Sequence, residues 1–191
     1  MTNELRAERR GGGWRIAGWG AAAGLLALPF IAMRMGSQEV NWDGADFVFA
    51  AVLLGSLGLA IELLFRVSGG WAYRLGGLAL AGTAFLIVWG NLAVGFLGNE
   101  DEPINLLYFG VVALVIAGAA ISRLRPAGLA KVAVAAAMGH VAIIAVALGT
   151  GWGYEGALRP VEIVFSTLVF GGAWLFAAAM FRRAARDASQ R

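Results

Sequence analysis

Cysteine is absent from this chain, and histidine occurs once, as His140. The absence of cysteine excludes disulfide bonds, a thiolate nucleophile and a metal site built on thiolates. One histidine supplies neither the two axial ligands of a haem nor, without other residue types, a histidine-based metal site. The sequence also contains no nucleophile-elbow serine, no Walker loop and no HExxH segment. We therefore expect no metal, no cofactor and no enzymatic activity.

Charged residues are scarce as well, at 14% of the chain, whereas 60% of the residues are hydrophobic. Because an α-helix rises 1.5 Å per residue, about 20 apolar residues cross the hydrocarbon core of a bilayer. Six stretches are that long, which predicts an all-α, polytopic membrane bundle with six transmembrane helices. They are Trp14–Met33, Asp46–Phe65, Leu75–Gly98, Ile104–Ser122, Gly128–Gly149 and Val161–Phe181.

Most of the Lys and Arg residues lie near those ends of the stretches that would face one side of the membrane. Of the fifteen Lys and Arg, only Arg34 and Arg159 lie in the first, third or fifth connection. Short segments rich in Lys and Arg stay on the cytoplasmic side, so we predict that both termini are cytoplasmic. This topology accounts for the net positive charge, and no nucleic-acid partner is expected. The other thirteen are Arg6, Arg9, Arg10, Arg15, Arg66, Arg74, Arg123, Arg125, Lys131, Arg182, Arg183, Arg186 and Arg191.

The stretches leave no room for a soluble domain. We predict a cytoplasmic lead at residues 1–13, a six-span membrane domain at residues 14–181 and a basic cytoplasmic tail at residues 182–191. The connections are short, so successive helices should be antiparallel neighbours. A cleaved signal peptide is the alternative for the first stretch. Its apolar run is longer than the usual run of about 7–15 residues, and Ile31-Ala32-Met33 lacks the small-residue cleavage pattern.

Gly20 and Gly24 lie four residues apart in the first span, with three alanines between them. Small residues at this spacing let the backbone of a neighbouring helix approach closely in lipid. The expected partners are therefore the lipid bilayer itself and either a second copy of the chain or another membrane protein.

Tryptophans near the ends of the spans are expected to be interfacial anchors, because the indole ring prefers the headgroup region. Trp89 differs from these, since it lies well inside the third span. The expected anchors are Trp14, Trp19, Trp42, Trp71, Trp152 and Trp174.

Polar side chains inside the spans are few, and each is a functional candidate because burial in lipid is unfavourable for it. Glu62 lies about one turn from the cytoplasmic end of the second span with Arg66 at i+4, which favours an interfacial ion pair over a proton or cation site. Asn91 is expected to hydrogen-bond across helices, with a substrate contact as the alternative. His140 is expected to be neutral and satisfied by a neighbouring helix, with a proton relay as the alternative.

The connection at residues 99–103 is the most acidic stretch of the chain. Carboxylates directly before a proline predict a helix start, because they accept hydrogen bonds from free backbone N–H groups and favour the helix dipole. A divalent-cation site on Glu100, Asp101 and Glu102 is the alternative, but three neighbouring residues do not converge on one ion. Pro160 predicts a second helix start of the same kind.

Three groups of residues resemble segments of a known group of proteins. They are Asn41-Trp42 with Asp46-Phe47-Val48, then Val88-Trp89 with Asn91 and Ala93-Val94-Gly95, then Gly98 with Glu100-Asp101, Pro103, Asn105 and Tyr108-Phe109-Gly110. In these residues the chain resembles a family of small, multi-span bacterial inner-membrane proteins that have no assigned activity. The resemblance covers roughly Asn41 to Gly128 and implies a bacterial inner membrane, but it transfers no site. It makes Asn91, Glu100, Asp101 and Asn105 the first positions to test.

Two functions compete. The first is a non-enzymatic integral membrane protein with a structural or accessory role, which the scarcity of intramembrane polar groups favours. The alternative is a small transporter or channel that uses Glu62, Asn91 and His140 along a polar path. The alternative requires these three side chains to converge inside the protein.

Overall fold

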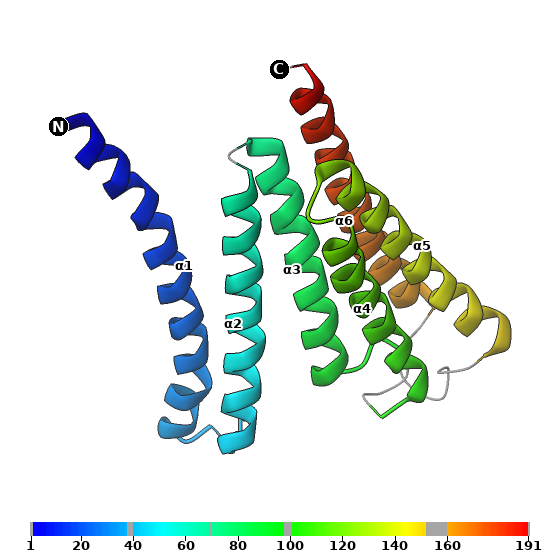
Figure 1. Ribbon diagram of the computed structural model, residues 1–191. Helices are drawn as coiled ribbons and strands as arrows, with labels where there is room; N and C mark the ends of the chain where they lie inside the picture. The colour runs from blue at the N-terminus through cyan, green and yellow to red at the C-terminus, as the bar shows by residue number, and fades with distance from the viewer. Residues whose placement is uncertain (1, 38–39, 69, 98–100, 152–159, 191) are drawn as a thin grey trace. The chain divides into compact units, whose positions relative to one another are not determined.

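The computed structural model describes residues 2–37, 40–68, 70–97, 101–151 and 160–190 (Figure 1). Within these ranges the regular structure is helical and no strand forms. The α-helices are α1 Thr2–Arg34, α2 Gly44–Val67, α3 Trp71–Ala93, α4 Leu106–Ile121, α5 Pro126–Thr150 and α6 Pro160–Ser189. A short 3-10 helix, η1 Pro103–Asn105, directly precedes α4.

Six helical segments of the described chain are long and apolar enough to cross a membrane, which confirms the six predicted spans. The protein is therefore a multi-pass membrane protein. The candidate spans are Gly13–Arg34, Gly44–Val67, Trp71–Ala93, Pro103–Ile121, Pro126–Thr150 and Ser166–Ser189.

Some helix ends differ from the predicted ones. The third span begins at Trp71 rather than Leu75 and ends at Ala93, because the chain leaves the helix before Gly95, whose φ is +69°. The fifth helix begins at Pro126, so Lys131 lies inside it rather than in the connection before it. The sixth helix continues to Ser189, and most of the basic tail therefore extends α6. Hydropathy alone misses such ends because polar residues can continue a helix beyond the apolar run.

Contacts divide the chain into two compact units, Met1–Leu63 and Leu64–Arg191. The first unit contains α1 and most of α2, and the second contains α3 to α6. Each unit is described by itself below.

In the first unit, the side chains of Asp43 and Asp46 fix the start of α2. The Asp43 carboxylate accepts hydrogen bonds from the backbone N–H groups of Ala45 (2.7 Å) and Asp46 (3.1 Å). The Asp46 carboxylate accepts one in return from the Asp43 N–H (2.9 Å), which completes a reciprocal capping arrangement. The Trp42 ring packs edge-on against Phe47, with 5.3 Å between ring centroids. Trp42 therefore staples the helix start.

Two contacts hold α1 against α2. The Trp19 ring lies over Gly58, where an added Cβ would be 3.1 Å from the ring. The Arg15 guanidinium donates a hydrogen bond to the Glu62 carboxylate and forms an ion pair with it. Partly buried positions of α1 continue the same helical face at alternating spacings of three and four residues. They are Ala22, Leu26, Pro29 and Met33.

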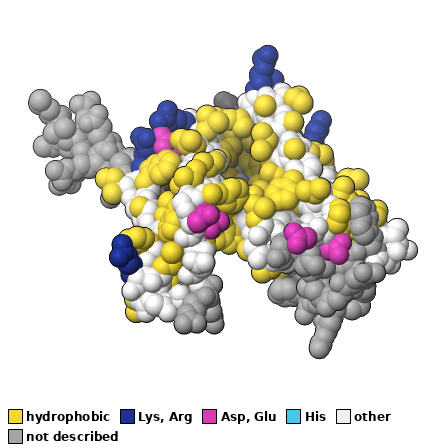
Figure 2. All heavy atoms as spheres, turned by 90° about the horizontal axis from the view of Figure 1, so that it is seen from below, with side chains coloured by type: hydrophobic (Ala, Val, Ile, Leu, Met, Phe, Trp, Pro, Cys, Tyr) yellow, Lys and Arg dark blue, Asp and Glu magenta, His cyan; other side chains and the backbone are white. Residues whose placement is uncertain are grey.

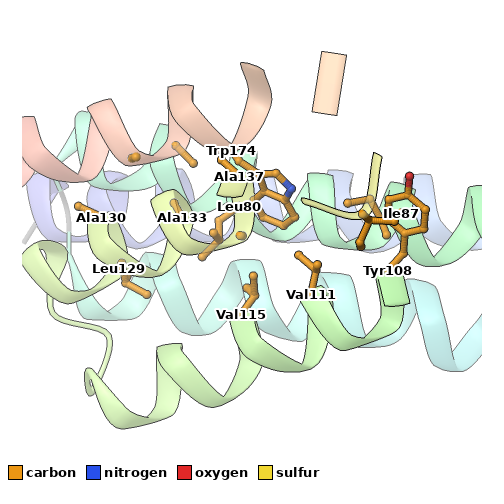
Figure 3. Close-up of a cluster of buried hydrophobic side chains, with 14 of the residues drawn as sticks. Leu80, Ile87, Tyr108, Val111, Val115, Leu129, Ala130, Ala133, Ala137 and Trp174 are labelled. Carbon is orange, nitrogen blue, oxygen red and sulfur yellow. The ribbon is translucent and has the colours of Figure 1, made fainter. Parts of the chain in front are cut away.

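In the second unit, α6 packs against both α3 and α5, while α4 packs against α5 and α3. The four helices share one apolar core, part of which Figure 3 shows. Close approach of α4 and α5 depends on glycine, because a Cβ at Gly118 would lie 2.6 Å from Val132 and one at Gly139 would lie 3.2 Å from Val111. In lipid, where the hydrophobic effect does not drive helices together, such close packing supplies the attraction.

Outward-facing positions of the helices are apolar, as a bilayer requires. In α4, for example, Leu106, Ile116 and Ile121 are exposed. Figure 2 shows apolar side chains over much of the visible surface, with basic and acidic side chains in a few small patches. These exposed side chains face hydrocarbon when the protein is in its membrane.

Candidate polar site in the second unit

Four polar side chains of the second unit, Asn91, Tyr108, His140 and Trp174, lie on the buried faces of their helices. In α5, His140 continues a buried face that contains Ala133, Ala136 and Ala137 at helical spacing. The small side chains before His140 leave room for the neighbouring helices to approach it. In α4, Tyr108 begins the buried face. Both side chains are buried almost completely.

Aromatic rings from two helices and one loop form a cluster with His140. The centroid of its imidazole lies 5.1 Å from the ring of Tyr108 on α4 and 5.8 Å from the ring of Phe170 on α6. Phe96, from the loop after α3, packs edge-on against both Tyr108 (5.3 Å) and Phe170 (5.0 Å). His140, Tyr108, Phe96 and Phe170 thus form a closed cycle of ring contacts, which we call the His140 cluster.

Trp174 and Asn91 are two further buried polar residues of the second unit. Trp174 follows Phe170 by one turn of α6 and is fully buried beside Leu80 and Ala137 (Figure 3). The Asn91 side-chain amide donates a hydrogen bond to the Ile87 carbonyl (2.9 Å), one turn earlier in α3. Ile87 is next to Tyr108 in Figure 3.

Several buried polar atoms of this region have no hydrogen-bond partner within the described part of the chain. They are both ring nitrogens of His140, the Tyr108 hydroxyl, the Trp174 Nε1 and the Asn91 Oδ1. A neutral histidine offers one donor and one acceptor, a tyrosine hydroxyl offers both, tryptophan only donates, and the asparagine oxygen only accepts. A buried group of this kind is unfavourable unless a small polar molecule satisfies it.

The chemistry available to these residues is limited. The named side chains include no carboxylate, lysine or arginine, so the region provides neither an acid–base pair nor a charged ligand clamp. No group of three or more His, Asp or Glu that could hold a metal ion occurs among the described residues. These side chains offer hydrogen-bond donors and acceptors but no ionised carboxylate, lysine or arginine.

Asn105 holds the loop that carries Phe96. Its side-chain oxygen accepts hydrogen bonds from the backbone N–H groups of Phe96 (3.2 Å) and Leu97 (3.0 Å). Its amide group donates to the Leu97 carbonyl (2.9 Å). Asn105 is buried, and it fixes the position of the Phe96 ring over the His140 cluster. It is a positioning residue for this cluster.

The structure buries two of the predicted polar positions, Asn91 and His140, in the second unit. Their predicted hydrogen bonds to neighbouring helices are wrong, because Asn91 bonds within its own helix to Ile87 and neither ring nitrogen of His140 has a partner among the described residues. Glu62 belongs to the first unit, where its ion-pair partner is Arg15 of α1. Its predicted pairing with Arg66 stays a prediction. Trp89 is partly buried in α3 and stacks on Phe85, with 6.0 Å between ring centroids.

The acidic connection contains two further predicted residues. Asp101 is exposed, and Glu100 lies outside the described residues. The predicted helix start at Pro103 is confirmed, since Pro103 is the first residue of η1. Glu102 occupies the capping position, but its side chain makes no capping hydrogen bond; instead its backbone carbonyl accepts one from the Asn105 N–H (2.9 Å).

The sequence interpretation missed three residues. Trp174 was expected at an interface, but it lies at the centre of the core because α6 is longer than the apolar run by which its ends were judged. Tyr108 is as deeply buried as His140, and its place at helical spacing from Val111 and Val115 was the available signal. Arg15 gave no local signal, because its partner Glu62 is distant in sequence.

Comparisons with known proteins give no homologue: no family model, no curated protein and no solved structure matches the chain. The functional argument therefore depends on the geometry alone.

Proposed function

We propose that this multi-pass protein is an accessory, non-enzymatic component of the bacterial inner membrane, and that it acts by self-association through α1. The proposal includes cytoplasmic N- and C-termini, in accord with the distribution of Lys and Arg. One observation supports the self-association: one face of α1 contacts α2, while another face carries small, exposed residues.

Arg15 and Trp19 lie on the face of α1 that contacts α2. At about 100° per residue, Gly13, Ala17, Gly20 and Gly24 lie roughly 120–180° around the helix from the middle of this contact face. All four are exposed, and a Cβ built at any of the three glycines would have no neighbour within 4 Å. We call this the small-residue face of α1.

A second copy of α1 is the partner that this face fits. Two small-residue faces related by a two-fold axis present the same residues to each other, so the contact is self-complementary. In lipid, close backbone approach supplies dispersion contacts and weak Cα–H hydrogen bonds. The contacts of Arg15 and Trp19 with α2 also support a first span that is retained rather than cleaved.

Cysteine cross-linking in native membranes tests the proposal directly, because the chain contains no cysteine of its own. Gly20→Cys and Gly24→Cys should form disulfide-linked dimers under mild oxidation, since a disulfide needs Cα atoms within about 7 Å. Leu25→Cys is the matched control, because Leu25 is exposed but lies to the side of the small-residue face. Equal dimer yields at all three positions would indicate random collision, and no dimer at any position would leave another membrane protein as the partner; either result contradicts self-association.

Topology is tested separately by reporter fusions. A fusion after Asp101 should report the periplasm, and a fusion after Arg186 should report the cytoplasm. The same compartment for both would contradict the six-span topology with cytoplasmic ends.

A small transporter or channel is the second candidate, and the polar atoms without partners around His140 favour it. Proton or solute flux in reconstituted vesicles distinguishes the two functions. The accessory proposal expects the same flux as in empty vesicles, whereas a flux that His140→Phe and Asn91→Leu both abolish would establish transport instead.

A further inference from the structure

His140 and Tyr108 are in contact, yet they make no hydrogen bond to each other. Their ring centroids are 5.1 Å apart, with an angle of 56° between the ring planes. Both side chains are almost completely buried. Neither ring nitrogen of His140 nor the hydroxyl of Tyr108 has a hydrogen-bond partner within the described part of the chain. Two neighbouring side chains therefore lack partners in the same place.

The other two members of the His140 cluster cannot supply the missing hydrogen bonds. Phe96 contacts Tyr108, and Phe170 contacts His140, but a phenyl ring has no conventional donor or acceptor. A buried tyrosine hydroxyl ordinarily finds a partner, because burial without one leaves its lost hydrogen bonds to water uncompensated. The same argument holds for a neutral imidazole, which offers one donor and one acceptor.

The contact between these two side chains is accessible from one end of the second unit. Tyr108 lies in the first turn of α4, directly after η1, and Phe96 follows the end of α3. Asn105 holds Phe96 at this end through the hydrogen bonds to the backbone of residues 96 and 97. A small molecule that reaches the Tyr108 hydroxyl from this end has to cross only the ends of these helices.

We propose that a buried water molecule is bound between the Tyr108 hydroxyl and a ring nitrogen of His140. An ordered buried water needs about two to four polar partners, and α4 and α5 supply one each through these side chains. Water can donate to or accept from either group. It is also the smallest such molecule, so it suits closely packed rings better than an organic solute does. The site is independent of association through α1, and it satisfies these polar atoms without any transport function.

The test uses the fact that the chain contains one histidine, so that ¹⁵N labelling of histidine reports on this site alone. Solid-state NMR of the full chain in lipid bilayers measures the transfer of magnetisation from water protons to the imidazole nitrogens. The unsubstituted protein should show this transfer, together with the ¹⁵N shift of a hydrogen-bonded imidazole. This measurement decides whether water is present before any residue is replaced.

Tyr108→Phe removes the hydroxyl and keeps the ring that contacts Phe96 and His140. It should abolish the transfer from water to the imidazole, because the water then keeps a single partner of the two. Tyr73→Phe is the matched control. Tyr73 is also buried, but its hydroxyl donates to the Leu124 carbonyl (2.8 Å), so its removal should leave the imidazole signals unchanged. Both variants should remain monodisperse.

Several results would overturn the proposal. A hydrogen-bonded imidazole without transfer from water would show that a group of the protein is the partner; if Tyr108→Phe then breaks that bond, the group is the Tyr108 hydroxyl itself. An imidazole whose ¹⁵N shifts show no hydrogen bond would mean that the contact is dry. Undiminished transfer in Tyr108→Phe would place the water elsewhere, and equal loss in Tyr73→Phe would indicate a general change of packing instead of a site.

Discussion

The two units of this protein are built from similarly apolar helices, yet they bury very different shares of them. No residue of the α1 span is buried and 17% of the α2 span is, whereas the spans of α3 to α6 have between 28% and 39% of their residues buried. Among the described residues of the first unit, the Trp19 ring lies over Gly58 and Arg15 pairs with Glu62. The second has a continuous core of side chains from four helices.

This difference shows that the apolar composition of a membrane-spanning helix does not indicate how tightly the helix packs against the rest of the protein. Lipid solvates an exposed leucine as well as a core does, so the sequence can leave a helix poorly packed without penalty. Packing is then decided by small residues that allow close approach and by the shapes around them. We infer that the second unit is the stable body and that the first is the part available for association.

The largest expected effect comes from replacing a tryptophan by alanine, and it should differ between the two units. Trp174→Ala in the second unit removes a fully buried ring and should lower the free energy of unfolding by about 3–5 kcal/mol. Trp19→Ala in the first unit removes a ring that is 42% exposed and should cost about 1 kcal/mol. Unfolding in detergent by titration with SDS measures both. Similar losses would mean that the first unit is packed as well as the second.

The second prediction concerns glycine at close approach. Gly118→Ala should destabilise the second unit by about 2–3 kcal/mol, because the new Cβ would meet the stiff, β-branched side chain of Val132. Gly110→Ala, in the same helix, meets nothing within 4 Å and is the matched control. It should be neutral or slightly stabilising, because alanine favours a helix. The same titration compares them, and equal effects would contradict close packing of α4 on α5.

Whether a structural feature could be predicted from the sequence depends on how far apart in the chain its interacting residues lie. The six spans follow from local composition, and so do the helix starts at Pro103 and Pro160. The burial of His140 also followed, because a lone polar residue within an apolar span must find an interior. These features depend on residues that are close together in the chain.

The division into two units and the partners of the polar groups could not be predicted. Arg15 pairs with Glu62 across 47 positions, and Tyr73 bonds to Leu124 across 51. A carboxylate in a span has an arginine at i+4 as its obvious local partner, and only the folded chain offers a distant one. The burial of Trp174 was not predicted, for a related reason: a tryptophan lies at the membrane interface only where the other helices of the bundle do not cover it.

The third prediction tests whether Asn105 positions the loop over the His140 cluster. Asn105→Ala removes three hydrogen bonds to the backbone of Phe96 and Leu97 and should cost about 1–2 kcal/mol. Amide hydrogen exchange at residues 96 and 97 should accelerate far more than exchange in α5. Asp43→Ala, which removes the cap of α2 in the first unit, should instead accelerate exchange at Ala45 and Asp46. Unchanged exchange at 96 and 97 would contradict the positioning role.

The smallest expected effect concerns the ion pair of the first unit. Glu62→Gln and Arg15→Gln, alone and combined, form a double-mutant cycle whose coupling energy isolates the pair. The Arg15 side chain is 47% exposed, so solvent and headgroups screen the pair and the coupling should be below about 1 kcal/mol. A coupling of 3 kcal/mol or more, the range for breaking a buried pair, would mean that Glu62 and Arg15 are sealed from solvent. The first unit would then be held as firmly as the second, and the contrast between the two units would no longer support the proposed association through α1.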